Sequence, residues 1–306
     1  MRYRRLGSTD LPVSVIGVGT WQFGGEWGKS FTTDEVKEMF AAAGEAGINL
    51  IDTAECYGDH ESERLTGTAI SGQRDRWIIA SKFGHKFHGY MNRTEPRTPA
   101  DVVEQTEASL RALQTDYLDI QQYHSWGDSQ FFQDDVMESL LRLRSEGKIR
   151  YLGNSIGNNQ NVRQIGASRE RQISVIQIVY NYLSREPEGT TFPLCVEQDL
   201  GVLARVPLAS GMLSGKYEPG HVFPGGDVRS RKRAMAHGDE THRAIERARA
   251  ESPHGTELAT FALAWCLQHP AVSAVIPGCK SVAQVQANAK AAELTIVDSR
   301  HPQAMA

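Results

Sequence analysis

The stretch INLIDTAECYG, residues 48–58, joins a short apolar run to a polar ending. The apolar run predicts a buried strand, since short apolar runs bounded by turn residues are typical of strands that are covered on both faces. The strand ends in Asp52, and Tyr57 follows five residues later in a loop that Gly58 closes. The stretch therefore places a carboxylate at the end of a buried strand and a phenol just beyond it.

Two later apolar runs also end in a polar side chain. Residues 77–82, WIIASK, end in Lys82, and residues 117–124, YLDIQQYH, end in His124. In a barrel of parallel strands, polar residues at the strand ends converge on the carboxyl-terminal mouth. Unpaired charges are costly inside such a barrel. We therefore expect the polar side chains that end these three strands, together with Tyr57, to meet at one mouth.

Strand and helix patterns alternate along the whole chain. Strands are expected at residues 16–20, 48–52, 77–82, 117–123, 151–155, 175–178, 202–206 and 272–276. Helices are expected at about 33–46, 61–70, from 99 onward, 133–146, 159–167 and 192–198, with Thr33 as the cap of the first. This alternation predicts one α/β domain, residues 1–306, built as a (β/α)8 TIM barrel. An N-terminal β-hairpin, residues 3–6 and 13–15, precedes the barrel.

Two long segments interrupt the alternation, residues 84–99 and 211–240. Loops of this length inside a compact domain are often functional. Both follow predicted barrel strands, so we expect both at the mouth. His85 and His88 in the first segment are expected to be solvated loop residues.

Composition excludes several classes of protein. A formal net charge of −4 gives no reason to expect nucleic acid or an anionic membrane as a partner. No run of 18 apolar residues is present, and no apolar stretch follows the first residues as in a signal peptide. The cysteines at 56, 195, 266 and 279 fit neither a zinc motif nor a disulfide framework. We expect a cytoplasmic protein, monomeric or homo-oligomeric, without a metal.

The four polar side chains suit one kind of chemistry. A tyrosine hydroxyl, with a pKa of about 10, is a poor acid at neutral pH, and a nearby ammonium such as that of Lys82 lowers this value. Asp52 would hold the lysine charged, and His124 could hydrogen-bond a substrate oxygen. The set is suited to delivering a proton to a carbonyl oxygen. None of the four donates hydride, so a cofactor must supply it.

The sequence resembles the aldo-keto reductase family at these residues, over about residues 3–288. The matching positions are Asp52, Thr53, Ala54, Tyr57, Gly58, Ser81, Lys82 and His124. The resemblance implies an NAD(P)H-dependent oxidoreductase that interconverts an aldehyde or ketone with the corresponding alcohol or sugar. In this reading Tyr57 is the general acid and base, Lys82 lowers its pKa, Asp52 orients Lys82 and His124 positions the carbonyl. The hairpin would cap the bottom of the barrel.

The resemblance also implies how a dinucleotide would bind. No GxGxxG motif follows a strand, and the family holds the cofactor extended across the barrel mouth. The corresponding positions are Gly19, Thr20, Trp21, Asp52, Ser155, Gln177, Pro207, Leu208, Ser210, Gly211, Leu213, Gly215, Lys216, Gly278, Lys280, Ser281, Gln284 and Asn288. Lys280 and Ser281 stand where the family places groups for a 2′-phosphate. This favours NADP, with NAD as the other candidate.

The chain departs from the family pattern at three of these sites. Ile156 stands in place of an asparagine, Arg205 in place of an aromatic residue that stacks on nicotinamide, and Ala287 in place of a glutamate. Arg205 could reach substrate or a phosphate instead. The residues expected around a substrate are Trp21, Trp27, Phe87, Trp126 and Arg205.

Two other functions remain open at this stage. The chain could be a dinucleotide-binding regulatory or auxiliary protein that keeps the scaffold, as ion-channel auxiliary subunits resembling the family do. It could also be a metal-dependent barrel hydrolase, because metals favour His and Asp at strand ends. Lys82 would be a poor neighbour for a cation, which disfavours the hydrolase.

Overall fold

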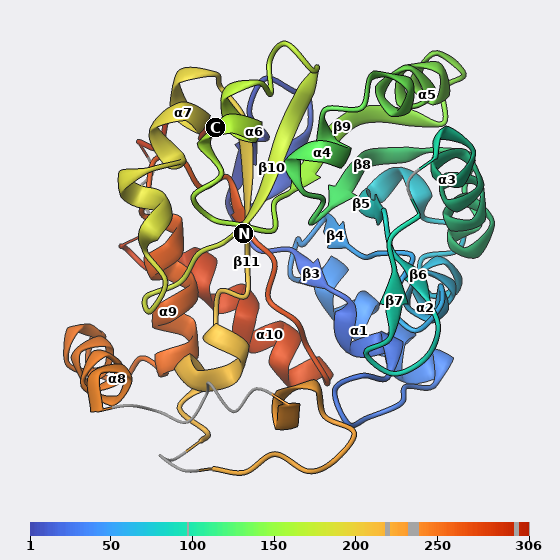
Figure 1. Ribbon diagram of the computed structural model, residues 1–306. Helices are drawn as coiled ribbons and strands as arrows, with labels where there is room; N and C mark the ends of the chain where they lie inside the picture. Colours follow the sequence, from blue (N-terminus) through green and yellow to red (C-terminus); the bar gives the residue numbers. More distant parts are fainter. Residues whose placement is uncertain (97, 218–220, 232–238, 297–299, 306) are drawn as a thin grey trace.

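Eight parallel strands form the central sheet of the computed structural model, which describes residues 1–96, 98–217, 221–231, 239–296 and 300–305 (Figure 1). Along the sheet they run β3 (Val18–Gly19), β4 (Leu50–Asp52), β5 (Ile78–Phe83), β8 (Leu118–His124), β9 (Ile149–Ser155), β10 (Ile173–Val179), β11 (Gly201–Arg205) and β12 (Ala274–Val275). Parallel bridges from Ile16 to Val275 and from Gly19 to Gly278 join the first strand to the last. The sheet is therefore closed, and the predicted (β/α)8 barrel is confirmed.

The helices lie around the strands, as Figure 1 shows. Their bounds are α1 (Thr33–Glu45), α2 (Glu61–Ala69), α3 (Pro99–Leu113), α4 (Asp128–Phe131), α5 (Asp134–Ser145), α6 (Val162–Gly166), α7 (Phe192–Glu197), α8 (Asp239–Glu251), α9 (Leu258–Leu267) and α10 (Val282–Lys290). The cap of α1 is Thr32, one residue before the predicted Thr33. Thr32 forms a capping box with Glu35, which satisfies two backbone N–H groups at that end.

The hairpin forms at the expected place, from β1 (Tyr3–Arg5) and β2 (Pro12–Ser14). Its apolar side chains pack into one cluster with inward residues of the barrel strands: Leu6, Leu11 and Val13 meet Leu50, Ile78, Ala80, Ile120, Val175, Leu203 and Ala274. Several of these strand residues stand at or near the amino ends of their strands. The hairpin therefore covers the bottom of the barrel, as predicted.

Period-two alternation along the strands explains what lies above this apolar layer. Side chains two residues apart point to the same face of a strand. Two residues after Leu50, Ala80, Ile120 and Val175 come Asp52, Lys82, Gln122 and Gln177, all of them buried. The same inward face thus changes from apolar at the bottom to polar at the mouth, and this polar layer is the floor of the site.

The two long segments contain more regular structure than the sequence suggested. Residues 84–99 include a second hairpin, β6 (Lys86–Phe87) with β7 (Arg93–Thr94). Residues 211–240 include part of a 3-10 helix, η4 (Ala209–Ser214), and a second, η5 (Val228–Arg231); positions 218–220 and 232–238 of that segment lie outside the described residues. In the described part of the chain, no helix combines the length and apolarity needed to cross a membrane.

Candidate active site

Lys82 is the centre of the polar layer. Its side chain is 0 % exposed, and its Nζ lies 2.9 Å from each carboxylate oxygen of Asp52 and 2.7 Å from the carbonyl oxygen of Thr53. The same Nζ lies 3.2 Å from the Tyr57 hydroxyl. A buried ammonium needs a charged partner and further acceptors for its protons. Asp52, Thr53 and Tyr57 provide them, so the lysine is fixed in direct contact with the phenol.

Asp52 is also held from the far side of the barrel. Gln177 donates its side-chain N–H to Asp52 Oδ1 at 2.6 Å, and Ser155 donates its hydroxyl to Gln177 Oε1 at 3.1 Å. Gln122, which the sequence did not single out, lies 3.5 Å from Asp52 Oδ1 and 3.4 Å from Gln177. The polar groups of β4, β5, β8, β9 and β10 therefore form one connected network. Gln177 has the partners that a buried amide requires.

The expected lowering of the Tyr57 pKa is not found. Burial raises the pKa of the Tyr57 phenol above its usual value, and the opposing effect of the Lys82 charge is smaller. The pKa of Lys82 is also raised: burial lowers it, but the charges and hydrogen bonds of Asp52 and Tyr57 together outweigh that effect. Both groups keep their protons at neutral pH, so the phenol has a proton that it can donate.

His124 lies beside this pair at the end of β8. Its ring stands edge-on to the Tyr57 ring, with centroids 6.0 Å apart. Burial, followed by the charges of Lys82, Arg205 and Arg93, lowers the pKa of His124 well below its usual value. His124 is therefore a neutral imidazole that can form a hydrogen bond near the phenol.

His85 is placed differently from the sequence expectation. Its ring centroid is 4.6 Å from that of His124, and its side chain lines the cavity described below. Burial, followed by the proximity of His124, lowers the pKa of His85 to about 4. His88 is exposed, as expected. The second hairpin carries His85 inward, a fold-back that local composition does not reveal.

One group of side chains has metal-ligand chemistry. Ligand atoms of Glu55, Cys56 and His124 lie within 4.8 Å of one another, and Glu55 Oε2 has no hydrogen-bond partner among the described residues. Burial raises the pKa of Glu55 and that of the Cys56 thiol, and the thiol is protonated at neutral pH. Lys82 and Arg93 act on Cys56 as nearby positive charges. These features oppose the binding of a cation.

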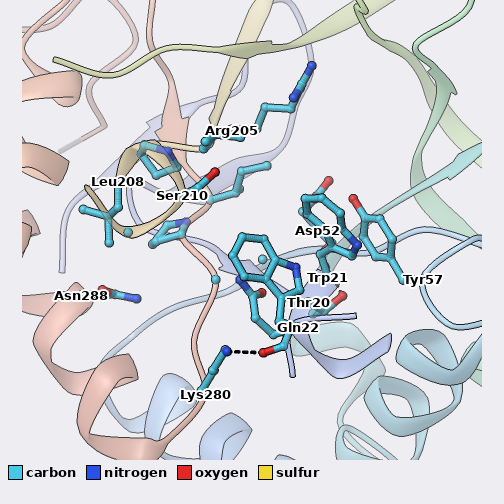
Figure 2. Close-up of a pocket in the computed structure, with 18 of the residues that line it drawn as sticks. Thr20, Trp21, Gln22, Asp52, Tyr57, Arg205, Leu208, Ser210, Lys280 and Asn288 are labelled. Atoms are coloured by element: carbon cyan, nitrogen blue, oxygen red, sulfur yellow. Dashed lines mark hydrogen bonds between the residues drawn. The ribbon is translucent and has the colours of Figure 1, made fainter. Parts of the chain in front are cut away.

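Above the polar layer lies a cavity of about 480 Å³ (Figure 2). The predicted site residues that line it are Gly19, Thr20, Trp21, Trp27, Asp52, Tyr57, His124, Ser155, Gln177, Arg205, Pro207, Leu208, Ser210, Gly211, Lys216, Gly278, Lys280, Gln284 and Asn288. Trp21 stacks on the Tyr57 ring with centroids 5.9 Å apart, and Trp27 stands edge-on to Trp21 at 5.1 Å. Aromatic walls thus flank the phenol.

Other predicted residues lie outside this lining. Trp126 is 2 % exposed, packs against Phe83 and Tyr123, and donates its N–H to the carbonyl of Gly84. Phe87 lies on β6 and contacts Arg93. Neither aromatic lines the cavity, because core packing holds Trp126 and Phe87 lies on the second hairpin. Leu213, which is fully buried, Gly215 and Ser281 do not line the cavity either, and Lys82 lies beneath it.

Several lining residues escaped the sequence reasoning, among them Gln22, Arg93, Ser125, Tyr217, Arg229 and Glu257. Arg93 donates to the carboxylate of Glu26, 67 positions away in the chain. A backbone bridge joins Trp27 to Asp227, and Arg229 pairs with Asp227 at 2.7 Å. These contacts link loops that are distant in sequence. The basic residues at 229–233 were the one visible signal, and positions 232 and 233 lie outside the described residues.

The far end of the cavity is rich in positive charge. Lys280 Nζ donates to the carbonyl of Trp27 at 2.6 Å (dashed in Figure 2), and Lys29 Nζ lies 3.4 Å from the carbonyl of Lys280. Burial lowers the pKa of Lys280, and the charges of Arg229 and Lys29 lower it further. Among the described residues, Lys280 has no carboxylate within salt-bridge distance. Of the three cations at this end, Lys29 is paired with Glu35 and Arg229 with Asp227, and Lys280 is the one that could bind an anion.

The cavity also has features that fit a dinucleotide. Gln22 Oε1 is buried and has no hydrogen-bond partner among the described residues. A Cβ at Gly19 would lie 2.7 Å from the carbonyl oxygen of Ile276, and one at Gly278 would lie 2.0 Å from the Gln22 side chain. Ser210 and Gly211 have φ of 57° and 100°. Such left-handed turns present backbone N–H groups to anions. A cavity with a left-handed turn in its wall and a basic end would suit an extended nucleotide.

Comparison with known proteins agrees with this geometry. Residues 15–304 match the model of the Aldo/keto reductase family. A Bacillus subtilis protein named aldo-keto reductase YhdN is 32% identical over 300 residues, covering 94% of this chain and 87% of the relative. An NADH-specific methylglyoxal reductase of Escherichia coli is 28% identical over 312 residues, covering 96% and 94%.

Solved structures show the same relationship. An aldo-keto reductase from Bacillus halodurans in its holo form superposes with a TM-score of 0.81 and 30% identity, covering 99% of this chain and 94% of the other. An aldo-keto reductase from Klebsiella pneumoniae in complex with NADPH has a TM-score of 0.71 and 29% identity, covering 96% and 90%. By fold, site and sequence, the chain belongs to the aldo/keto reductase family of nicotinamide-dependent oxidoreductases.

Proposed function

We propose that the protein reduces aldehydes or ketones with NADPH, and oxidises the corresponding alcohols or sugars in reverse, with Tyr57 as the general acid and base. The observation that carries this proposal is the buried array of Asp52, Lys82 and Tyr57 beneath a cavity with aromatic walls. A bound nicotinamide supplies the hydride to the carbonyl carbon.

The side chains of the site carry out the proton transfer and orient the carbonyl group. Tyr57 gives its proton to the carbonyl oxygen as negative charge develops there. Lys82 stabilises the tyrosinate that remains, because its ammonium is in contact with the phenol oxygen. Asp52 keeps Lys82 charged and fixed in place. His124, as a neutral imidazole, donates or accepts a hydrogen bond at the carbonyl oxygen and orients it.

The predicted cofactor residues would each contact a different part of the dinucleotide. Ser155 and Gln177 would bind the nicotinamide carboxamide by exchanging their present mutual bond, and the turn at 207–216 would cover the pyrophosphate. Lys280, with Ser281 at the start of α10, would bind the 2′-phosphate. The cluster of Lys280, Lys29 and Arg229 supports NADP over NAD, as does the NADPH complex of the Klebsiella relative. The NADH-specific relative of Escherichia coli keeps NAD as the other candidate.

We further propose that residues 1–306 form one domain and act in the cytoplasm. The hairpin packs beneath the barrel instead of forming a separate unit, and the family match reaches residue 304. The cysteines at 56, 195, 266 and 279 are free and buried, which suits a reducing compartment. The expected partner is a small-molecule carbonyl compound, alcohol or sugar.

The test is NADPH oxidation followed at 340 nm with a panel of aldehydes, ketones and polyols, before and after chelation of metals. Turnover that survives chelation supports the proposal and excludes a metal-dependent hydrolase. Tight NADPH binding without turnover on any carbonyl would contradict it and favour an auxiliary dinucleotide-binding protein instead.

A further inference from the structure

We infer that Arg205 binds a carboxylate on the substrate, so that the preferred substrates are aldehydes or ketones carrying a carboxylate group. The inference rests on the proposed carbonyl reduction and names its substrate class. Its starting point is that Arg205, a charged residue at the mouth of the barrel, has no carboxylate partner among the described residues.

Arg205 is the last residue of β11 and lines the cavity. Its Nη2 donates to the backbone carbonyl of Ile156 at 3.1 Å, and its Nε is buried without a hydrogen-bond partner. Among the described residues, no carboxylate lies within salt-bridge distance of the guanidinium. One bond to a neutral oxygen therefore serves a group that has five N–H donors.

Three other cations of the mouth each have a carboxylate partner, whereas Lys280, assigned to the 2′-phosphate, has none in the described part of the chain. Lys82 is paired with Asp52, Arg93 with Glu26 and Arg229 with Asp227. Burial lowers the pKa of Arg205, but a guanidinium remains charged in proteins. Arg205 is half-buried at the cavity wall and has no carboxylate partner among the described residues, so its charge is only partly compensated. An anion that enters the cavity would complete the arrangement.

The place of the guanidinium identifies the anion as part of the substrate. The charge of Arg205 lies close enough to act on His124, Tyr57 and Asp52, and Arg205 lines the same cavity as these three residues. In Figure 2 the Arg205 side chain extends away from Lys280, the cation assigned to the 2′-phosphate. Asp52 cannot serve as its counter-ion, because it already accepts from Lys82 and Gln177. The anion that Arg205 would bind is therefore a group of the substrate, close to its carbonyl carbon.

A carboxylate fits the free donors best. The two Nη groups at the end of an arginine side chain lie in one plane and can donate side by side to the two oxygens of a carboxylate. In Arg205 the Nε is enclosed by protein, whereas Nη1 makes no hydrogen bond among the described residues and Nη2 has a second proton beyond the one given to Ile156. Arg205 is half-buried in the cavity wall, so its bond to a carboxylate would be less screened by water than one on the open surface.

The experiment compares 4-oxobutanoate with its methyl ester, which removes the charge and keeps the aldehyde. We expect wild-type kcat/KM to favour the acid by about tenfold or more, since charge-assisted hydrogen bonds have that strength. In Arg205→Gln the ratio of acid to ester should fall toward one, and Arg205→Lys should retain part of it. Circular dichroism and NADPH titration show whether each variant is folded.

Inhibition provides an independent readout. Succinate should inhibit aldehyde reduction competitively in the wild type, much more strongly than succinamide, and this difference should be lost in Arg205→Gln. An acid-to-ester ratio near one, or a ratio unchanged in Arg205→Gln, would overturn the inference while turnover of the ester upholds the proposed reduction.

Two further outcomes are decisive. Glyceraldehyde 3-phosphate preferred tenfold over 4-oxobutanoate, with the preference lost in Arg205→Gln, would replace the carboxylate by a phosphoryl group and overturn the assignment. If no carbonyl compound is turned over, the proposed function fails. The anion site is then tested on its own by calorimetric titration of succinate into wild type and into Arg205→Gln. Binding to wild type that is lost in the variant would support it, and equal binding to both would contradict it.

Discussion

The ammonium nitrogen of Lys82 lies 3.2 Å from the hydroxyl oxygen of Tyr57, fully buried beneath the cavity. Lys82 can only donate in this contact, so the phenol oxygen accepts and its own proton points elsewhere. Because Tyr57 lines the cavity, that proton is available to a bound carbonyl oxygen. The contact thus aims the acid and stabilises the anion that it leaves.

Replacing Lys82 by methionine should reduce both turnover and stability. The side chain of Asp52 would then be buried without its charged partner, a change that typically costs about 3–5 kcal/mol. Urea unfolding measures this loss. The double variant Asp52→Asn with Lys82→Met removes both charges and should recover much of the stability while remaining slow. A single variant as stable as wild type would show that the pair is not a buried ion pair in solution.

The pH profile of carbonyl reduction should be flat through neutral pH and decline only above about pH 10, the ordinary tyrosine pKa. Burial raises the pKa of Tyr57, so the acid keeps its proton across this range. The measurement is kcat/KM against pH with a saturating cofactor. An alkaline decline centred well below pH 10 would mean that the Lys82 charge outweighs burial once the cofactor is bound.

Acid should destabilise the protein through the two paired histidines. Burial lowers the pKa of His85 to about 4 and lowers that of His124 further below its usual value. The unfolded chain binds these protons at about pH 6.5. The stability is therefore fully present above that pH and is lost as pH falls toward 4. In urea titrations at pH 7 and pH 5, His85→Asn should reduce the difference, whereas the exposed His254→Asn should not.

Coenzyme choice should depend on Lys280. A charge-assisted contact contributes about 1.5–3 kcal/mol, so NADPH should bind roughly ten- to a hundredfold more tightly than NADH. Lys280→Ala should weaken NADPH binding and leave NADH binding nearly unchanged, as measured by fluorescence titration. Lys37→Ala, an exposed lysine on α1, is the matched control. An equal loss for both coenzymes would show that Lys280 does not contact the 2′-phosphate.

The polar floor of the site was predictable because it depends on strand periodicity. Asp52, Lys82 and His124 end apolar runs, and parallel strands bring such ends together. Lys280 could be assigned only through the family motif around it. These assignments need a strand pattern or a local motif, and no long-range contact enters them.

The walls of the site were not predictable, because distant loops determine them. Trp126 was expected at the substrate but is held in the core by Phe83, Tyr123 and the carbonyl of Gly84. His85 was expected in solvent but is turned inward beside His124. No local pattern distinguishes an aromatic that anchors a loop from one that faces a ligand.

The central claim is that Tyr57 protonates the carbonyl oxygen, and the most direct test is single-turnover NADPH oxidation by wild type and Tyr57→Phe with the best substrate of the panel. NADPH affinity, measured by fluorescence titration, controls for folding. The account predicts a rate lower by about 10²–10⁴-fold, the usual contribution of general acid catalysis, with NADPH still bound. A Tyr57→Phe rate close to that of wild type would contradict it.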